Sequence, residues 1–129
     1  MENKKINIGL FGFGTVGQGL WQVLAKTSNA HAEIRRICVR NIDKPRAVDV
    51  PRELMTDKAN DILDDPEINL IVEVIDTAEP AFEIVKAALE RGIPVVSGNK
   101  AMVANHLPEL IELQKRHNTA LLYDASSCG

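Results

Sequence analysis

The sequence is poor in the residues that would point to several common classes of protein. Its 129 residues include only two cysteines, Cys38 and Cys128, so we expect no disulfide framework and a reducing, cytoplasmic location. Aromatic residues make up 4% of the chain, so aliphatic side chains must form most of the core. No apolar run approaches the roughly 18 residues that cross a bilayer, and no membrane association is expected.

The sequence also lacks a cluster of positive charge. The formal net charge is −3, and the basic residues are scattered; even Arg35-Arg36 is too small to form a binding patch. Clustered Lys and Arg are what a phosphate backbone requires, so nucleic acid is not expected as a partner. The three histidines, His31, His106 and His117, do not stand at a metal-ligand spacing, and no metal site is predicted.

The most informative segment lies near the N-terminus. An apolar run over residues 6–11 leads into Gly12-Phe13-Gly14-Thr15-Val16-Gly17, and a helical pattern follows. Strand, glycine turn and helix in this order are the fingerprint of a dinucleotide site. Gly12 permits the tight turn, Gly14 lets the backbone approach a pyrophosphate, and Gly17 lets the helix lie against the sheet. The unpaired N–H groups at the start of the helix favour a phosphate.

Strands and helices alternate along the rest of the chain. Strands are predicted over residues 5–11, 33–40, 69–75, 93–97 and 119–123. Helices are predicted over 15–27, 56–63, 79–91 and 105–117, with Thr56-Asp57 and Asn105 as caps of the second and fourth. On the first helix, the expected apolar face consists of Val16, Leu20, Val23 and Leu24. Residues 41–52 form a polar loop. This order predicts an α/β fold of the Rossmann type, with a doubly wound, mostly parallel sheet.

The carboxyl ends of the strands are the expected binding edge of such a sheet. Arg40 follows the second strand, where an NAD site usually has an acid, and the nearest acid, Asp43, comes late. Arg40 can pair with a 2′-phosphate, which favours NADP over NAD; the alternative is a solvated surface arginine.

A second group of candidates lies at the end of the fourth predicted strand, in Ser97-Gly98-Asn99-Lys100. We expect Ser97 and Asn99 to contact the cofactor, although Asn99 can equally cap the next turn. The Lys100 ammonium can hold a substrate oxygen and stabilise the charge that develops on it. The alternative is an ordinary solvated lysine.

Several motifs together resemble homoserine dehydrogenase, in its N-terminal NAD(P)-binding part only. They are Ile-Gly-Leu-Phe-Gly-Phe-Gly-Thr-Val-Gly-Gln-Gly-Leu at 8–20, Ile-Val-Glu-Val-Ile at 71–75, Val-Val-Ser-Gly-Asn-Lys at 95–100 and Leu-Tyr-Asp-Ala-Ser at 122–126. The resemblance implies NAD(P)-dependent interconversion of L-homoserine and L-aspartate 4-semialdehyde, on the route to threonine and methionine. At Asp76-Thr77 the chain departs from the family, which usually has two glycines there.

The resemblance also implies roles for particular residues. It places Phe13, Thr15, Val16, Arg40, Thr77 and Lys100 at the cofactor, with Lys100 near the reacting carbon. It implies a monovalent cation in the complete enzyme, near the positions of Asp124, Ser127 and Gly129, and a homodimer when full length. Residues 1–129 then form one dinucleotide-binding domain, truncated before the substrate and dimerisation domain. We therefore expect this chain to bind cofactor without turnover.

Two other functions remain open from the sequence. One is a free-standing sensor that binds NAD(P) and changes its partners. The other is a semialdehyde or sugar oxidoreductase with the same first domain.

Overall fold

The fold is built on a six-stranded sheet in which every pair of neighbouring strands is parallel. The computed structural model describes residues 5–27 and 31–124. The strand order is β3-β2-β1-β4-β5-β6, the order of the doubly wound dinucleotide-binding fold. The strands are β1 (Ile6–Phe11), β2 (Ala32–Cys38), β3 (Met55–Thr56), β4 (Leu70–Glu73), β5 (Val95–Ser97) and β6 (Leu121–Tyr123).

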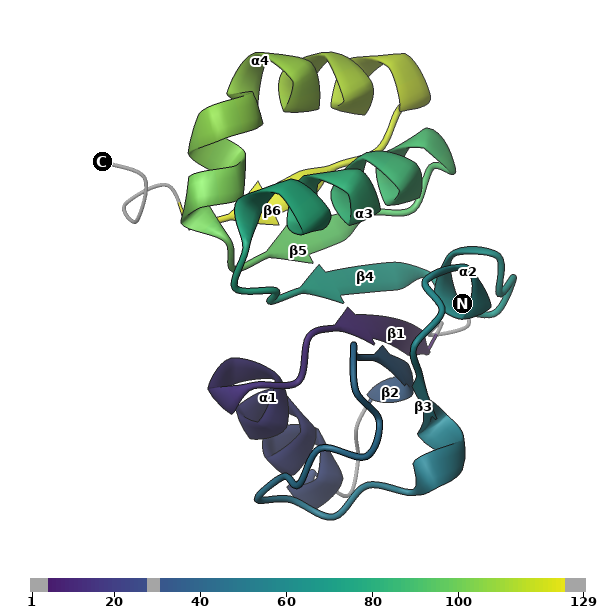
Figure 1. The fold of residues 1–129 in the computed structure, drawn as a ribbon. Helices are drawn as coiled ribbons and strands as arrows, with labels where there is room; N and C mark the ends of the chain where they lie inside the picture. The colour runs from purple at the N-terminus through teal and green to yellow at the C-terminus, as the bar shows by residue number, and fades with distance from the viewer. Residues whose placement is uncertain (1–4, 28–30, 125–129) are drawn as a thin grey trace.

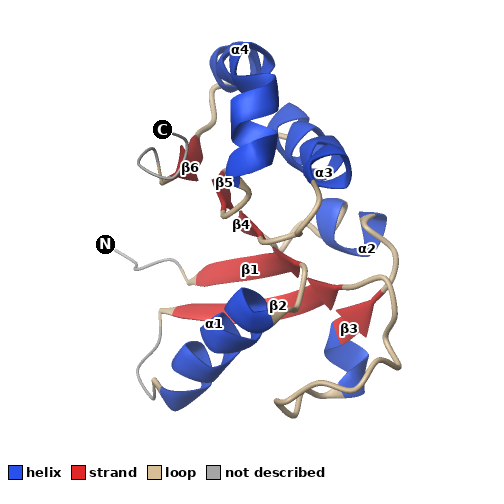
Figure 2. Ribbon diagram, turned by 60° about the vertical axis from the view of Figure 1, so that its left-hand side comes forward, coloured by secondary structure: helices blue, strands red, loops and turns tan. Residues whose placement is uncertain are grey.

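Helices cover the two faces of the sheet unequally (Figure 2). The helix α1 (Thr15–Lys26) packs over β1 and β2 on one face. On the other face lie α2 (Asn60–Leu63), α3 (Ala78–Glu90) and α4 (Lys100–His117). A short 3₁₀ helix, η1 (Arg52–Leu54), precedes β3.

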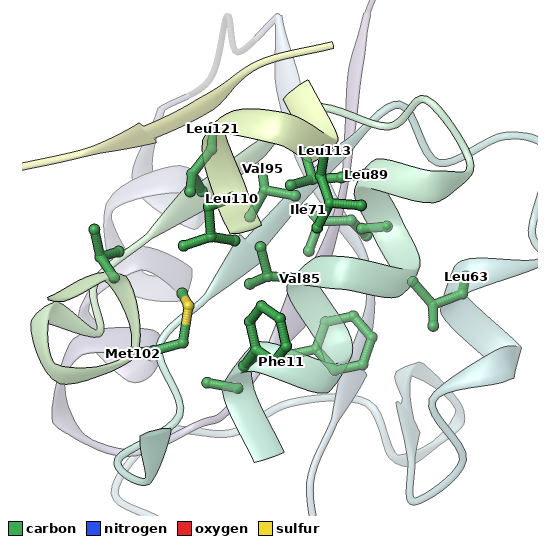
Figure 3. Close-up of a cluster of buried hydrophobic side chains, with 14 of the residues drawn as sticks. Phe11, Leu63, Ile71, Val85, Leu89, Val95, Met102, Leu110, Leu113 and Leu121 are labelled. Carbon is green, nitrogen blue, oxygen red and sulfur yellow. The ribbon is translucent and has the colours of Figure 1, made fainter. Parts of the chain in front are cut away.

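The larger core lies between the sheet and α2, α3 and α4 (Figure 3). Phe11 of β1 and Ile71 of β4 face Val85 of α3 and Met102 of α4, and each is at most 1% exposed. Apart from Phe11 and Phe82, the buried side chains of this cluster are aliphatic, as the low aromatic content requires. This core fixes the starts of α3 and α4 against the sheet.

The contact face of α1 differs from the predicted one. Val16 is 68% exposed and Val23 is 63% exposed, whereas Gly17 is buried. Leu20, Trp21 and Leu24 pack against the smaller core. The helix turns its glycine toward the sheet, because only a residue without a side chain allows this close approach. The prediction is therefore confirmed for Leu20, Leu24 and Gly17 and wrong for Val16 and Val23.

Two predicted caps are also wrong. Thr56 lies in β3 rather than at a helix start, and its Oγ1 accepts a hydrogen bond from the Lys58 N–H at 3.1 Å. The short helix begins only at Asn60. Likewise α4 begins at Lys100, and its cap is Asn99, whose side chain accepts from the Met102 N–H. Near Asn105, the predicted cap, the helix continues with a kink at His106, two residues before Pro108.

Candidate functional site

The residues selected from the sequence gather at one edge of the sheet. Because all strands are parallel, their carboxyl ends point the same way, as Figure 1 shows for β1 and β4. Phe11 is in register with Cys38 and with Glu73, and Glu73 with Ser97. The segments that leave this edge are therefore neighbours: the glycine turn 12–17, the loop after β2, residues 74–77 and residues 98–100.

The glycine turn fills the space between β1, β4 and α1. Gly12 has φ +96°, and a Cβ on it would lie 2.9 Å from the Val74 carbonyl oxygen. A Cβ on Gly17 would lie 2.6 Å from the carbonyl oxygen of Gly12. Both positions therefore require glycine, for conformation at Gly12 and for close packing at Gly17.

Gly14 is different, because its missing side chain leaves open space. No heavy atom lies within 4 Å of the Cβ position on Gly14. Gly14 is the N-cap of α1, where no side chain supplies a capping hydrogen bond and no acid stands in the first turn. Thr15 and Val16 are exposed. By contrast, the start of α4 is capped by Asn99 at 3.0 Å. The start of α1 thus offers unpaired N–H groups and room for an anion.

Phe13 places its side chain away from this opening. The ring is 5% exposed and belongs to the core beneath α1. Its carbonyl oxygen accepts a hydrogen bond from Gln18 Nε2 at 2.9 Å, and Gln18 Oε1 accepts from the Ala47 N–H at 3.1 Å. Gln18, which the sequence did not single out, thereby ties the loop after β2 to the glycine turn.

A buried polar network holds the ends of β4 and β5 together. Glu73 is 0% exposed; its Oε1 accepts from the Ser97 hydroxyl at 2.6 Å and its Oε2 from the Ile75 N–H at 2.8 Å. Asn99 Nδ2 donates to the carbonyl oxygens of Ile75 at 2.8 Å and Thr77 at 3.0 Å. The side chains of Ser97 and Asn99 are therefore engaged within the fold. Glu73 was missed, although a carboxylate inside the apolar run 70–75 was a visible signal.

Glu73 makes the stability of the chain depend on pH. Burial raises the pKa of its carboxyl above the usual 4.5, and the hydrogen bonds from Ser97 and Ile75 only partly oppose this. The folded state then binds the proton more tightly than the unfolded state, so this contribution is fully present below about pH 4.5 and is lost as the pH rises through the raised pKa.

We therefore expect the wild-type chain to lose stability relative to Glu73→Gln as the pH rises, by about 1.4 kcal/mol for each tenfold gain in proton affinity. Urea unfolding at several pH values measures this difference. The matched control is Glu83→Gln, at an exposed position on α3, whose difference from wild type should not follow pH in the same way. A constant difference for Glu73→Gln over this range contradicts the assignment.

Arg40 is exposed just beyond β2, as expected for a residue that meets the far end of a dinucleotide. The neighbouring acid, Asp43, is paired with Arg52 at 2.6 Å. The loop is held by Arg46, whose guanidinium donates to the carbonyl oxygens of Asn41, Ile42 and Lys44. The acid nearest to Arg40 is thus already engaged by another arginine.

Thr77 and Lys100 begin the two helices on the far side of the site. Thr77 is the N-cap of α3, and Lys100 is the first residue of α4. Both residues are exposed. They are brought together by Asn99, which precedes Lys100 and bonds the Thr77 carbonyl oxygen.

Two open surface hollows lie away from the strand ends. One of about 320 Å³ lies between Trp21, Leu24, Ile34 and Leu54, and one of about 330 Å³ lies beside Trp21 and Val48. Neither is lined by the glycine turn, Thr77 or Lys100. These two hollows are therefore not part of the candidate site at the strand ends.

In residues 5–27 and 31–124 we find little support for a metal site, a reactive thiol or a membrane-spanning helix. These residues contain no cluster of three or more His, Cys, Asp or Glu side chains that could hold a metal ion. Burial raises the pKa of the half-buried Cys38 thiol to about 11, which keeps it protonated. No helix in these ranges has the length and hydropathy to cross a membrane. Of the positions matched to the family's cation site, Ser127 and Gly129 lie outside the described residues, and Asp124 is the last one described.

The strand order, the glycine turn and the uncapped helix start together define a dinucleotide-binding domain of the Rossmann class. Residues 12–124 match the family model of the homoserine dehydrogenase NAD-binding domain. The chain belongs to this family, as the motifs predicted.

Similar proteins agree with this assignment. The chain is 33% identical to homoserine dehydrogenase of Synechocystis sp. over 96% of its length, and 37% identical to that of Corynebacterium glutamicum, also over 96%. A crystal structure of the S. aureus enzyme superposes with a TM-score of 0.79 at 34% identity, over 95% of this chain and 33% of that one. A hyperthermophilic archaeal homoserine dehydrogenase in complex with NADPH has a TM-score of 0.71 at 26% identity, over 95% of this chain and 44% of that one. The chain spans about 30% of the length of the two sequence relatives.

Proposed function

We propose that this domain binds NADP(H), or NAD(H) less tightly, for the interconversion of homoserine and aspartate 4-semialdehyde. The observation that carries the proposal is the open, uncapped start of α1 at the switch point between β1 and β4. In a doubly wound sheet, the dinucleotide lies across this point. Calorimetric titration of the chain with NADPH and with NADH is the test, and the absence of heat from both refutes the proposal.

In this proposal, the cofactor lies along the carboxyl ends of the strands. Gly12 and Gly17 shape the turn, while the N–H groups of Gly14, Thr15 and Val16 bind the diphosphate. The backbone of Phe13 borders the same opening. Thr77 and Lys100 border the nicotinamide end, which Ser97 and Asn99 support from below through the hydrogen bonds described above. The bound cofactor supplies or accepts the hydride.

Lys100 is proposed as the catalytic residue. Its ammonium group, at the start of α4, is placed to bind the substrate oxygen and to stabilise the negative charge that develops there.

Arg40 is proposed to select NADP. Because Asp43 is engaged by Arg52, no carboxylate stands ready for the ribose 2′-hydroxyl, whereas the Arg40 guanidinium is available to a 2′-phosphate. We expect Arg40→Asp to weaken NADPH binding at least about tenfold, equal to 1.4 kcal/mol, and to change NADH binding much less. Calorimetry with both cofactors measures the ratio.

The control for Arg40 is Arg116→Asp, at an exposed position in the last turn of α4. Arg116→Asp changes the net charge by the same amount as Arg40→Asp, but at a position far from the carboxyl ends of the strands. An equal loss of affinity for both cofactors in Arg40→Asp rejects the assignment.

Several properties of the complete enzyme are proposed from the family alone. They are a homodimer, a cytoplasmic location and a monovalent cation near Asp124. Hydride transfer also requires the substrate to be held in reactive geometry beside the cofactor, and the relatives have about two thirds of their length outside the match.

We therefore expect the 129-residue chain to bind NADPH without oxidising homoserine. The measurement is NADPH formation from homoserine and NADP at saturating concentrations. Turnover above the buffer rate contradicts this expectation.

A further inference from the structure

The first segment of α4 is mechanically separate from the rest of the helix. His106 has φ −127° and ψ 20° inside α4, two residues before Pro108. A kink of this kind interrupts the helical hydrogen bonds. The segment from Lys100 to Asn105 therefore does not take its orientation from the longer part of α4. Its orientation depends on the buried Met102 and Val103 and on the contacts at its two ends.

The N-terminal end of this segment is tied to the loop before α3. Asn99 Nδ2 donates to the carbonyl oxygens of Ile75 at 2.8 Å and Thr77 at 3.0 Å. Asn99 also caps the segment through the Met102 N–H at 3.0 Å. Lys100 follows directly, so its backbone is fixed to that of Thr77 through one side chain.

The C-terminal end is tied to the first turns of α3. His106 Nε2 lies 2.9 Å from Glu79 Oε1. The imidazole ring stacks on Phe82 with a centroid distance of 3.8 Å and an interplanar angle of 7°. The side chain of His106 is only 15% exposed, whereas Glu79 is 71% exposed. The segment is thus held at both ends by residues 75–82.

We propose that His106 is a positioning residue for the cofactor site, which together with Asn99 clamps the segment carrying Lys100 against the start of α3. This inference rests on the proposed function, because it assigns the clamp to the nicotinamide end of the same site. The side-chain contacts of His106 described here are to α3 and to α4 itself, so we assign its effect to the placement of Lys100 relative to Thr77.

The charged groups facing His106 give the clamp a pH dependence with a defined sign. They are Glu79 of α3, and Glu109 of α4 itself at 3.4 Å from Nδ1. The bond to Glu79 is the largest cause that raises the pKa of His106 above 6.5, and Glu109 adds to it, while burial opposes both. The charged pair is fully present below the ordinary pKa and is lost as the pH rises through the raised one.

The two glutamates provide a matched pair of variants. Both are exposed and both face the same imidazole, but only Glu79 connects α4 to α3. We expect NADH affinity in the wild-type chain to fall about two- to fivefold as the pH rises above 6.5 and His106 loses its proton. Glu79→Gln should abolish this dependence, and Glu109→Gln should retain it. NADH is the probe because a 2′-phosphate would itself titrate near pH 6.

A second measurement needs no cofactor. In the free chain, the backbone amide resonances of residues 99–105 should follow the titration of the His106 ring in the wild type and in Glu109→Gln, but not in Glu79→Gln. If the chain binds neither NADH nor NADPH, the proposed function fails, and this measurement alone decides the clamp. The clamp is overturned if those amides do not follow His106, or if the two glutamate variants behave alike.

Discussion

Gly14→Val is expected to weaken NADPH binding by about a hundredfold while the chain remains folded. The Cβ position on Gly14 has no heavy atom within 4 Å, so the free protein accommodates a side chain. A diphosphate on the N–H groups of Gly14, Thr15 and Val16 has to occupy that space. We expect affinity to fall by about a hundredfold, or 2.8 kcal/mol, and stability to fall by no more than about 1 kcal/mol, the cost of a poor N-cap. Calorimetry and urea unfolding measure the two quantities.

The same substitution one turn further along α1 is the control. The Cβ position on Gly19 also has no heavy atom within 4 Å, but it lies inside the helix, beyond the N–H groups that the phosphate needs. Gly19→Val should bind NADPH as the wild type does. If Gly14→Val binds NADPH with unchanged affinity, the diphosphate does not lie where the proposal places it.

Gly17→Ala is expected to affect the stability of the chain more than its affinity for NADPH, which is the reverse of Gly14→Val. Its Cβ would lie 2.6 Å from the carbonyl oxygen of Gly12, a backbone atom held in the turn by the hydrogen bond from the Gly12 N–H to the Cys38 oxygen. Either α1 moves away from the sheet or the turn is distorted. We expect a loss of about 3 kcal/mol, at the upper end for an overpacked core position. NADPH binding then weakens because the same turn is displaced. Urea unfolding is the measurement.

Gly92→Ala is the control for Gly17→Ala. It shows the general effect of replacing a glycine where the new Cβ does not clash with another atom. Gly92 ends α3 with φ +74°, and nothing lies within 4 Å of its Cβ position. Its replacement should cost about 1–2 kcal/mol, from the left-handed conformation alone, and should leave cofactor binding unchanged. If Gly17→Ala is as stable as the wild type, α1 does not pack against the turn as described.

The sequence predicted the class of fold because the relevant signals are local. An apolar run, three glycines at fixed offsets and a helical pattern are visible without knowledge of the neighbours, and the alternation of elements implies parallel strands. The residues at the strand ends could therefore be selected before the structure was known. The contacts of each glycine could not be predicted, since the neighbours of Gly12 lie in the residues that follow β4 and the neighbours of Gly17 lie in the turn itself.

The features that the sequence did not predict depend on tertiary contacts. The two-residue strand β3 is too short to show an alternation of apolar and polar residues. It is held beside the end of β2, where the Thr56 carbonyl oxygen accepts a hydrogen bond from the Val39 N–H at 2.9 Å. The burial of Glu73 depends on Ser97, which lies 24 residues away in sequence. The pairing of His106 with Glu79 spans 27 residues and requires the kink in α4. No spacing rule connects residues so far apart.

The central claim is that the N–H groups at the start of α1 hold the diphosphate of NADP(H). A crystal structure of the chain grown with excess NADPH tests it most directly. We predict the diphosphate against the backbone of Gly14, Thr15 and Val16, with the nicotinamide toward Thr77 and Lys100. A dinucleotide bound instead in the hollow beside Trp21 and Leu24, or a crystal in which the glycine turn holds no phosphate, would contradict the claim.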